Sequence, residues 1–304
     1  MLAVQYRNYG SPDVLEVVSR AEPHAQEGAV RIRVLAVSIN PIDYLLRAGQ
    51  LEQIMPVEFP AIPGRDAVGV VDEIGAGVDD VATGDKVFGL GGVADTTAEY
   101  AVLTAWAKVP ATWNDEQAAA AGLASVTALQ ALDALGSMAG ATIVVDGAAG
   151  AVGGAAAAFA LAAGAEQVIG TARNANHERL RAQGVTPVAY GDGLVERIRA
   201  VAPDGIDFAL DAAGAGSLAQ LVELVGHPQR VVTVADHGGA REVGVVAVNA
   251  VNDSGLLGRA ATIADAGRYT PHVSASMSFR GAARAHALSE AGGGKIVLRV
   301  GLDV

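Results

Sequence analysis

The sequence contains no cysteine, and aromatic residues make up only 4% of its 304 residues. Without thiols the chain cannot form disulfides, thiolate zinc sites or cysteine-ligated iron–sulfur clusters. With so few aromatic residues, a core has to be built from Val, Leu, Ile and Ala. Hydrophobic residues amount to 51% of the chain, which is enough apolar material for roughly two folded domains.

Positive charge is also scarce. Lys and Arg number 21 against 33 Asp and Glu, which gives a formal net charge of −12. This charge repels phosphate backbones and anionic membranes, so neither nucleic acid nor a membrane is an expected partner. The N-terminal residues MLAVQYRNYG contain no basic segment followed by an apolar run, and they predict no signal peptide. Together these features predict a soluble, cytoplasmic protein that acts on a small molecule.

Polar side chains are absent from Gly147 to Ala165, within the stretch VVDGAAGAVGGAAAAFALAAGA. Three interpretations compete: a membrane span, Ala/Gly low complexity, and the phosphate-binding turn of a nucleotide fold. Ala and Gly contribute little transfer free energy, and no aromatic belt flanks the stretch. The membrane span is therefore disfavoured, and the surrounding pattern has to decide between the other two.

The pattern of predicted elements changes after Pro110. Before it, short Val-rich runs such as 29–39, 66–76, 84–90 and 98–110 alternate with turns, which is typical of an antiparallel β domain. After it, helices at 115–121 and 125–135 are followed by apolar strands that alternate with helices from 142 to 235. That alternation predicts an α/β domain with a parallel sheet covered on both faces. The remaining segment, 253–304, contains two helical patterns and a closing strand at 295–300.

The turn at residues 147–153 follows the first strand of this alternation and opens a helix. Its small residues allow a tight turn, close approach of a pyrophosphate and close packing of helix on strand. The helix N-terminus then offers free N–H groups to the phosphates. Chance spacing in an Ala/Gly-rich chain is the alternative, but the position at the first strand–helix junction favours dinucleotide binding by Gly147, Gly150, Ala151, Val152 and Gly153.

The end of the second strand distinguishes the two dinucleotides. An acidic residue there binds the ribose 2′-hydroxyl in NAD sites, but Thr171-Ala172-Arg173-Asn174 has none. Arg173 could pair with a 2′-phosphate, with Tyr190 beside it at the end of the third strand. Alternatively, Arg173 is a solvated loop residue. The sequence therefore favours NADPH as the cofactor.

No group in the sequence indicates metal or nucleophilic catalysis. The six histidines are not paired at helical spacing and no cysteine completes a site, so a catalytic zinc is not expected. Hydride transfer suits such a chain, because the cofactor carries the reactive chemistry. The protein then has to position the acceptor and stabilise the charge that develops on its oxygen.

Several segments in order resemble the zinc-independent medium-chain dehydrogenases/reductases of the NADPH:quinone oxidoreductase (zeta-crystallin-like) group. The segments are Asn40-Pro41-Ile42-Asp43, Pro63–Val71, Gly84–Gly89, Val126-Thr127-Ala128, Gly147–Gly153, Ile169–Ala172 and Gly294–Leu298. The resemblance implies a GroES-like β-rich catalytic domain (1–113 and 253–304) split around a Rossmann doubly wound domain (114–252). It also implies NADPH-dependent reduction of a quinone or an α,β-unsaturated carbonyl, in a homodimer.

Site residues follow from the resemblance. Zinc-dependent relatives hold Cys and His where this chain has Asn40 and Arg65. The family commonly places Tyr or Lys five residues after the Asn, whereas this chain has Leu45 there and Tyr44 before it, so either Tyr44 or water supplies the proton. The predicted catalytic residues are Asn40 and Tyr44. The predicted cofactor-binding residues are Asn40, Thr127, Gly147, Gly150, Ala151, Val152, Gly153, Thr171, Arg173, Tyr190 and Val234.

Each candidate has a structural alternative. Asn40 could cap a turn before Pro41, Tyr44 could line a cleft, and Thr127 could bond its own helix. We expect Arg47 to be a surface charge. Asp146 is unexpected before a phosphate-binding turn, because it adds negative charge there. Two other functions stay open: a catalytically silent NADPH-binding sensor or structural protein, and an alcohol dehydrogenase relative that has lost its zinc.

Overall fold

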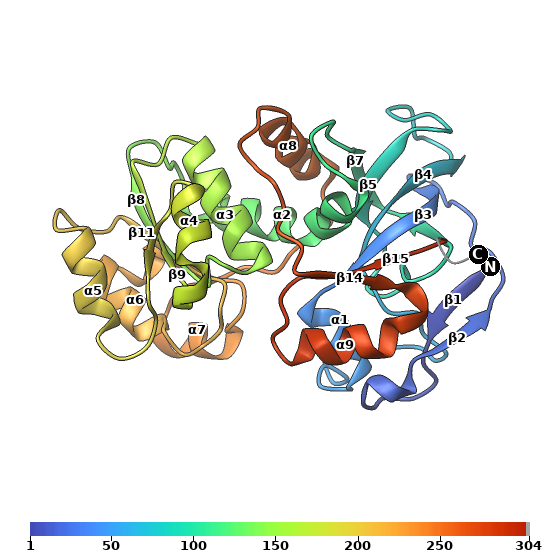
Figure 1. Cartoon of the computed structure of the whole chain (residues 1–304), viewed down its shortest axis with the longest axis horizontal. Coiled ribbons are helices and arrows are strands. Elements are labelled where there is room, and N and C mark those ends of the chain that lie inside the picture. The colour runs from blue at the N-terminus through green and yellow to red at the C-terminus, as the bar shows by residue number, and fades with distance from the viewer. Residues whose placement is uncertain (302–304) are drawn as a thin grey trace. The chain divides into compact units, whose positions relative to one another are not determined.

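A computed structural model describes residues 1–301, in which the chain forms two compact units (Figure 1). Unit 1 contains Met1–Leu123, Asn252–Asp265 and the chain from Thr270 to the end of the described part. Unit 2 contains Ala124–Val251 and Ala266–Tyr269. Each unit has its own core, so each is described by itself.

Unit 1 is built on a seven-stranded sheet, mostly antiparallel, with the order β14-β15-β3-β4-β5-β7 and with β6 paired to β3. The strands are β14 (Ala275–Ser278), β15 (Ile296–Arg299), β3 (Val30–Ile39), β4 (Asp66–Ile74), β5 (Lys86–Leu90), β6 (Tyr100–Leu103) and β7 (Ala105–Lys108). A separate pair joins β1 (Leu2–Gln5) and β2 (Glu16–Ser19). The helices are α1 (Pro41–Arg47), α8 (Ser254–Asp265) and α9 (Ala282–Glu290), with 3₁₀ turns η1 (Pro12–Val14) and η4 (Phe279–Gly281).

The core of unit 1 consists mainly of Val, Ile, Leu and Ala from this sheet, closed by Phe279 and Ala285 near and within α9. The register brings three strand ends to one edge of the sheet, because Ile39 pairs with Ile296 of β15 and Ser38 pairs with Asp66 of β4. Residues that precede or follow these ends, such as Asn40, therefore share that edge.

Unit 2 is built on a six-stranded parallel sheet with the order β10-β9-β8-β11-β12-β13. The strands are β8 (Thr142–Asp146), β9 (Gln167–Thr171), β10 (Thr186–Val188), β11 (Phe208–Asp211), β12 (Val231–Thr233) and β13 (Val246–Ala247). Counted along the chain this is 3-2-1-4-5-6, the order of a dinucleotide-binding doubly wound sheet. The predicted Rossmann and β-rich fold classes are confirmed.

The helices of unit 2 connect these strands. They are α3 (Ala151–Ala162), α4 (His177–Ala182), α5 (Leu194–Val201), α6 (Leu218–Val225) and α7 (His237–Val243), with 3₁₀ turns η2 (Asn174–Asn176) and η3 (Pro228–Arg230). The apolar residues of α5 and α6 face the same core as Val144, Ile169 and Val231 of the strands. In this sheet the strand order reverses between β8 and β11, and ligands bind at such a point.

The compact units divide the chain at Leu123/Ala124 and Val251/Asn252, whereas the predicted domain boundaries of 113/114 and 252/253 stay a prediction. A single helix, α2 (Asp115–Leu135), replaces the two predicted helices, and the first boundary falls inside it. Residues up to Leu123 belong to unit 1 because the Leu123 N–H donates to Asp66 Oδ1 at 2.6 Å. Asn252 already belongs to unit 1, where its Nδ2 donates to the Gly91 carbonyl at 2.8 Å.

A short segment of the C-terminal region also belongs to unit 2. Tyr269 packs edge-on against Phe159 of α3, with ring centroids 4.7 Å apart. This aromatic contact explains why Ala266–Tyr269 is part of unit 2, although the sequence analysis placed it in the catalytic domain.

The stretch 147–165 forms a turn followed by α3, a helix of 12 residues, which is short for a membrane span. In residues 1–301 one helix, α2, is long and apolar enough to cross a membrane, and 83% of its apolar window is buried inside the protein. Burial of this kind is typical of a core helix.

Some predicted elements were wrong in detail. The predicted strand at 98–110 is two strands, because Thr104 leaves the ladder between β6 and β7. The third parallel strand ends at Val188, so Tyr190 lies two residues beyond it. The analysis missed β14, whose sequence ASMS has no β-branched residue, and it missed α7, which contains two glycines.

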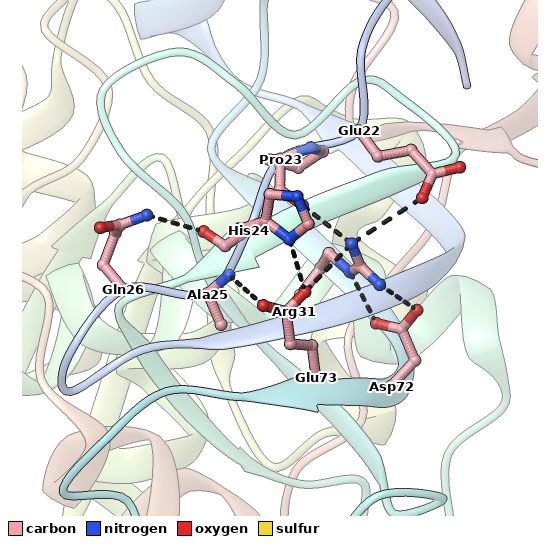
Figure 2. A network of polar contacts seen from close by, with 8 residues as sticks. All are labelled: Glu22, Pro23, His24, Ala25, Gln26, Arg31, Asp72 and Glu73. Atoms are coloured by element: carbon pink, nitrogen blue, oxygen red, sulfur yellow. Dashed lines mark hydrogen bonds and ion pairs between the residues drawn. The ribbon is translucent and has the colours of Figure 1, made fainter.

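A polar network fixes the segment before β3 to β4 (Figure 2). The Arg31 guanidinium donates to both Asp72 carboxylate oxygens at 3.0 Å and to the Pro23 carbonyl at 2.9 Å. It also lies 3.1 Å from Glu73 Oε2, and its side chain is only 13% exposed. The Asp72 hydrogen bond is the main cause that raises the pKa of Arg31. The partly buried Arg31 guanidinium therefore connects β3 with β4 and with the segment that contains Pro23.

Replacement of Arg31 by Met should lower the free energy of unfolding by about 1.5 kcal/mol, because Asp72 and the Pro23 carbonyl lose their donor. Arg7→Met is the matched control, since the Arg7–Glu16 pair is 66% and 48% exposed and should contribute less than about 1 kcal/mol. Urea denaturation of both variants measures the difference. Equal losses would show that burial does not strengthen the Arg31 network.

Candidate functional site

The turn after β8 has the geometry that a bound pyrophosphate requires. Gly147 has φ +79°, a conformation that other residues rarely adopt. A Cβ on Gly153 would lie 2.3 Å from the Gly147 carbonyl oxygen, so only glycine allows the first turn of α3 to pack on this loop. The turn lies at the point where the strand order of the sheet reverses. Residues 147–153 thus form a tight turn without polar side chains, which we call the glycine cradle.

The start of α3 supplies hydrogen-bond donors to this cradle. Gly150 is the N-cap residue, with extended backbone (φ −77°, ψ 174°), and Ala151, Val152 and Gly153 form the first turn. The first N–H groups of a helix have no intrahelical acceptor, and the helix dipole favours an anion at that end. All five residues predicted to bind the pyrophosphate are therefore in one turn, and their geometry fits a dinucleotide.

Asp146, the unexpected carboxylate before the turn, is buried, and each of its two oxygens accepts a hydrogen bond. The hydroxyls of Thr171 and Ser217 donate to its two oxygens, and the side chain is 3% exposed. The Thr171 hydroxyl also accepts from the Gly147 N–H at 2.9 Å. The carboxylate therefore ties the ends of β8 and β9 and the start of α6 together. It orders the turn, while its charge is offset by hydrogen bonds.

This contact also defines the position of Thr171. Thr171 is 1% exposed, and its hydroxyl already bonds to Gly147 and Asp146 at the ends of the two strands. Its predicted contact with the cofactor is untested and stays a prediction. Val234 directly follows β12 and donates its N–H to the Asp211 carbonyl at 3.0 Å, so it lies at the same carboxyl edge of the sheet.

Arg173 and Tyr190 lie together beyond the ends of β9 and β10. The Arg173 Nε donates to the Tyr190 hydroxyl at 3.4 Å, and the Tyr190 side chain is 55% exposed. The structure thus brings these two predicted residues to one place, where a guanidinium and a phenol could both reach an anionic group.

Arg179 was missed by the sequence analysis. From α4, its Nη2 donates to the Ala149 carbonyl of the glycine turn at 3.0 Å, and burial lowers its pKa. A cation therefore contacts the turn itself. The sequence gives no signal for this contact, because it joins residues that are 30 positions apart.

In unit 1, Asn40 is held in a buried cluster at the shared strand ends. Its Nδ2 donates to Asp66 Oδ2 at 2.8 Å, and its Oδ1 accepts from Lys295 Nζ at 2.6 Å. Asn40 is also the N-cap of α1, where its backbone N–H donates to Asp43 Oδ2 at 2.7 Å. The structural alternative for Asn40, a cap before Pro41, is thus present. The side-chain amide takes part in a separate set of contacts.

Tyr44 and Leu45 follow on α1. Tyr44 is partly buried and packs against the core of unit 1, and burial raises the pKa of its hydroxyl. Its role as a proton donor stays a prediction. Thr127 lies in the part of α2 that belongs to unit 2, with 8% exposure.

The expectation that Arg47 is a surface charge is wrong. Its side chain is 1% exposed, and it pairs with Glu290 of α9. Its Nε also donates to the Gly10 carbonyl at 3.2 Å. Beside it, His286 is 1% exposed; burial is the main cause that lowers the pKa of this imidazole to about 3, and the charge of Arg47 adds to it.

Asp43 is also buried in this region. Burial raises the pKa of its carboxyl to about 7, against the hydrogen bond from the Asn40 N–H, which lowers it. Arg65 occupies the second position at which zinc-dependent relatives hold a zinc ligand. Its Nη2 donates to Asn252 Oδ1 at 2.8 Å.

A cavity of about 710 Å³ lies elsewhere in unit 1, and none of the predicted site residues is among those that line it. Its charged residues include Arg33, Glu99, Asp115, Glu116 and Arg299. Arg299 lies 3.9 Å from Glu116, so part of this charge is neutralised internally. This cavity is not a candidate for the reaction.

Comparisons with known proteins agree with this geometry. Residues 26–113 match the family model of the alcohol dehydrogenase GroES-like domain, and residues 151–278 match that of the zinc-binding dehydrogenases. The quinone oxidoreductase of Lama guanicoe is 30% identical over 246 residues, which cover 78% of this chain and 74% of that protein. The chain belongs to the medium-chain dehydrogenase/reductase family, in its zinc-independent quinone oxidoreductase group.

Two further proteins are similar to this chain. The 2-methylene-furan-3-one reductase of Solanum lycopersicum is 31% identical over 248 residues, which cover 77% of this chain but only 62% of that protein. A mycobacterial protein whose structure is complexed with NADPH is 25% identical, with a TM-score of 0.81 and coverage of 98% of this chain and 100% of that one.

The zinc in the name of one family model does not fit the residues present here. The chain has no cysteine, and residues 1–301 contain no group of three or more His, Asp or Glu that could hold a metal ion. The two positions where the resemblance places zinc ligands hold an amide and a guanidinium, and a guanidinium is no metal ligand. No step of the reaction is therefore assigned to a metal.

Proposed function

We propose that the protein is an NADPH-dependent, metal-free reductase that transfers a hydride to a quinone or an α,β-unsaturated carbonyl. The observation that carries the proposal is the glycine cradle at the point where the parallel strand order reverses. The names of the quinone oxidoreductase and enone reductase relatives support the acceptor class. The family member solved with NADPH supports the cofactor.

Unit 2 would hold the cofactor. The first turn of α3 (Ala151, Val152 and Gly153) would bind the pyrophosphate through its backbone N–H groups. Gly147 and Gly150, whose own N–H groups bond within the turn, would shape the loop around it. Arg173 and Tyr190 would bind the 2′-phosphate, since no carboxylate follows β9 to select a 2′-hydroxyl. When bound, NADPH supplies the hydride for the reduction.

Unit 1 would supply the polar groups for the acceptor. Negative charge develops on the acceptor oxygen as its carbon is reduced, and a fixed hydrogen-bond donor stabilises that charge. Asn40 is the residue with an amide in a buried, ordered setting. The Tyr44 hydroxyl, whose pKa burial raises, or solvent would provide the proton that completes the reduction.

Absorbance at 340 nm tests the function directly. The purified protein should oxidise NADPH faster than NADH with at least one of 1,4-benzoquinone, 9,10-phenanthrenequinone, 2-cyclohexen-1-one or trans-2-hexenal. Tight NADPH binding without turnover of any acceptor would favour the silent NADPH-binding protein. Oxidation of alcohols with NAD would favour the zinc-less alcohol dehydrogenase.

The preference for NADPH should depend on Arg173. Arg173→Ala should raise the Kd for NADPH about tenfold and leave that for NADH unchanged, because the guanidinium meets only the 2′-phosphate. Arg199→Ala is the control, since Arg199 is an exposed arginine of the same unit, paired with Glu223 at 3.0 Å. Fluorescence titration with both nucleotides measures the change. Equal loss of NADPH and NADH affinity would remove Arg173 from the 2′-phosphate site.

A further inference from the structure

Three strand ends of unit 1 bring Asn40, Asp66 and Lys295 together. Asn40 follows β3, Asp66 begins β4, and Lys295 precedes β15. Lys295 Nζ lies 2.6 Å from Asn40 Oδ1 and 3.1 Å from Asp66 Oδ2, and Asn40 Nδ2 donates to the same Asp66 oxygen at 2.8 Å. The side chains of Lys295 and Asp66 are 4% and 0% exposed. The three groups form a closed, buried triangle.

The triangle permits one orientation of the Asn40 amide. Its oxygen faces an ammonium and its nitrogen faces a carboxylate. A rotation by 180° would place oxygen against carboxylate and N–H against ammonium, which hydrogen-bond chemistry forbids. Asn40 therefore keeps one N–H, fixed in direction, for a further partner.

Asp66 anchors the triangle. Besides Lys295 and Asn40, its carboxylate accepts from the Ser38 hydroxyl and from the Leu123 N–H, both at 2.6 Å. Four hydrogen bonds saturate the usual capacity of a carboxylate. Since β3, β4, α2 and the start of β15 all contribute, the orientation of Asn40 is set by the tertiary fold.

One amide hydrogen of Asn40 is left over. Within residues 1–301, Nδ2 donates to Asp66 alone, and Asn40 is 5% exposed. An N–H that is fixed in direction matches an oxygen acceptor, such as a carbonyl. The neighbouring ammonium withdraws electron density through the amide oxygen, which makes the remaining N–H a stronger donor.

We propose that Lys295 and Asp66 are positioning residues that fix Asn40 as the hydrogen-bond donor to the carbonyl oxygen of the acceptor. This inference rests on the proposed function. Asn40 touches the acceptor, whereas Lys295 and Asp66 act through Asn40. The roles of Lys295 and Asp66 go beyond the proposed function, in which Asn40 alone of the three residues was given a part.

A double-mutant cycle in kcat tests the proposal. Lys295→Met should lower kcat about 30-fold and leave the Kd for NADPH within threefold, because only the stabilisation of the acceptor oxygen is lost. Asn40→Leu should lower kcat at least as much. Lys295→Met in the Asn40→Leu background should then change kcat less than threefold, since Lys295 acts only through Asn40. Lys86→Met, at an exposed lysine that pairs with Asp115, is the control with unchanged kcat.

A charge-neutral double variant and an NMR measurement distinguish loss of the positioning role from a failure to fold. If Lys295→Met fails to fold, the charge-neutral pair Lys295→Met with Asp66→Asn replaces it and should show the same 30-fold loss. Protein labelled with [¹⁵N]asparagine reports the Asn40 side-chain amide directly: its resonance should shift in Lys295→Met and not in Lys86→Met.

The outcomes separate the two proposals. Additive losses in the cycle, or a kcat within threefold of wild type in Lys295→Met, would overturn the positioning role. An unmoved Asn40 amide resonance would overturn it without any reference to turnover. A wild-type protein that binds NADPH but reduces none of the four acceptors would overturn the proposed function, and with it the donor role of Asn40.

Discussion

Gly153→Ala should raise the Kd for NADPH about 100-fold and lower the free energy of unfolding by about 2 kcal/mol. The added Cβ would lie 2.3 Å from the Gly147 carbonyl oxygen and 2.7 Å from its carbonyl carbon. Both are backbone atoms, so the turn and α3 have to move apart. That movement displaces the N–H groups of α3 from the position that the pyrophosphate needs.

Gly154→Ala is the matched control in the next position. Its Cβ would lie 3.4 Å from the Ala148 carbonyl oxygen, an ordinary contact, and alanine stabilises a helix by about 0.5–1 kcal/mol over glycine. We expect this variant to gain stability and keep its affinity. Fluorescence titration and urea denaturation compare the two. If Gly153→Ala bound NADPH as tightly as Gly154→Ala, the cradle would not be the pyrophosphate site.

The glycine turn could be predicted from the sequence because every part of it is local. β8, the turn and α3 are consecutive, and the spacing of small residues within them reflects contacts inside 20 or so positions of the chain. The alternation of strands and helices was predicted to begin at residue 142, where β8 begins, and the turn at 147–153 was predicted to open a helix, as it does with α3.

The partners of Asn40 could not be predicted in the same way. Lys295 is 255 positions from Asn40 and Asp66 is 26 positions away. Only the register of β15, β3 and β4 brings them to one edge. The Gly294–Leu298 segment contributed to the family resemblance, but no role was predicted for Lys295. A lysine is normally exposed to solvent, and nothing in the sequence near it indicates a buried partner.

The same reason explains the error at Arg47. A charged residue on a short helix is normally exposed, and its partner Glu290 lies 243 positions away on α9. Asp146 is the converse case, since it was unexpected before a phosphate-binding turn because it adds negative charge there. Two hydroxyls, one of them from Ser217 71 positions later, offset that charge. In each case the missing information was a tertiary partner.

His286 should make the protein sensitive to acid. Burial and Arg47 lower its pKa to about 3, from an ordinary value near 6.5. Between these two values the unfolded chain binds a proton that the folded protein does not bind. Stability therefore falls as the pH decreases through 6.5 and continues to fall toward 3. Asp43 acts in the opposite direction: its pKa, raised to about 7, means that the folded protein binds the extra proton between about 4 and 7.

His286→Leu isolates the histidine, because Asp43 is present in both proteins and cancels in the difference. Nδ1 of His286 has no hydrogen-bond partner among the described residues, so leucine removes an unsatisfied polar atom. The advantage of the variant over wild type should grow by about 2 kcal/mol between pH 7 and pH 5. His227→Gln, at an exposed position, is the control. Urea denaturation at both pH values measures this advantage, and parallel curves for His286→Leu and wild type would mean that His286 takes up its proton in the folded protein.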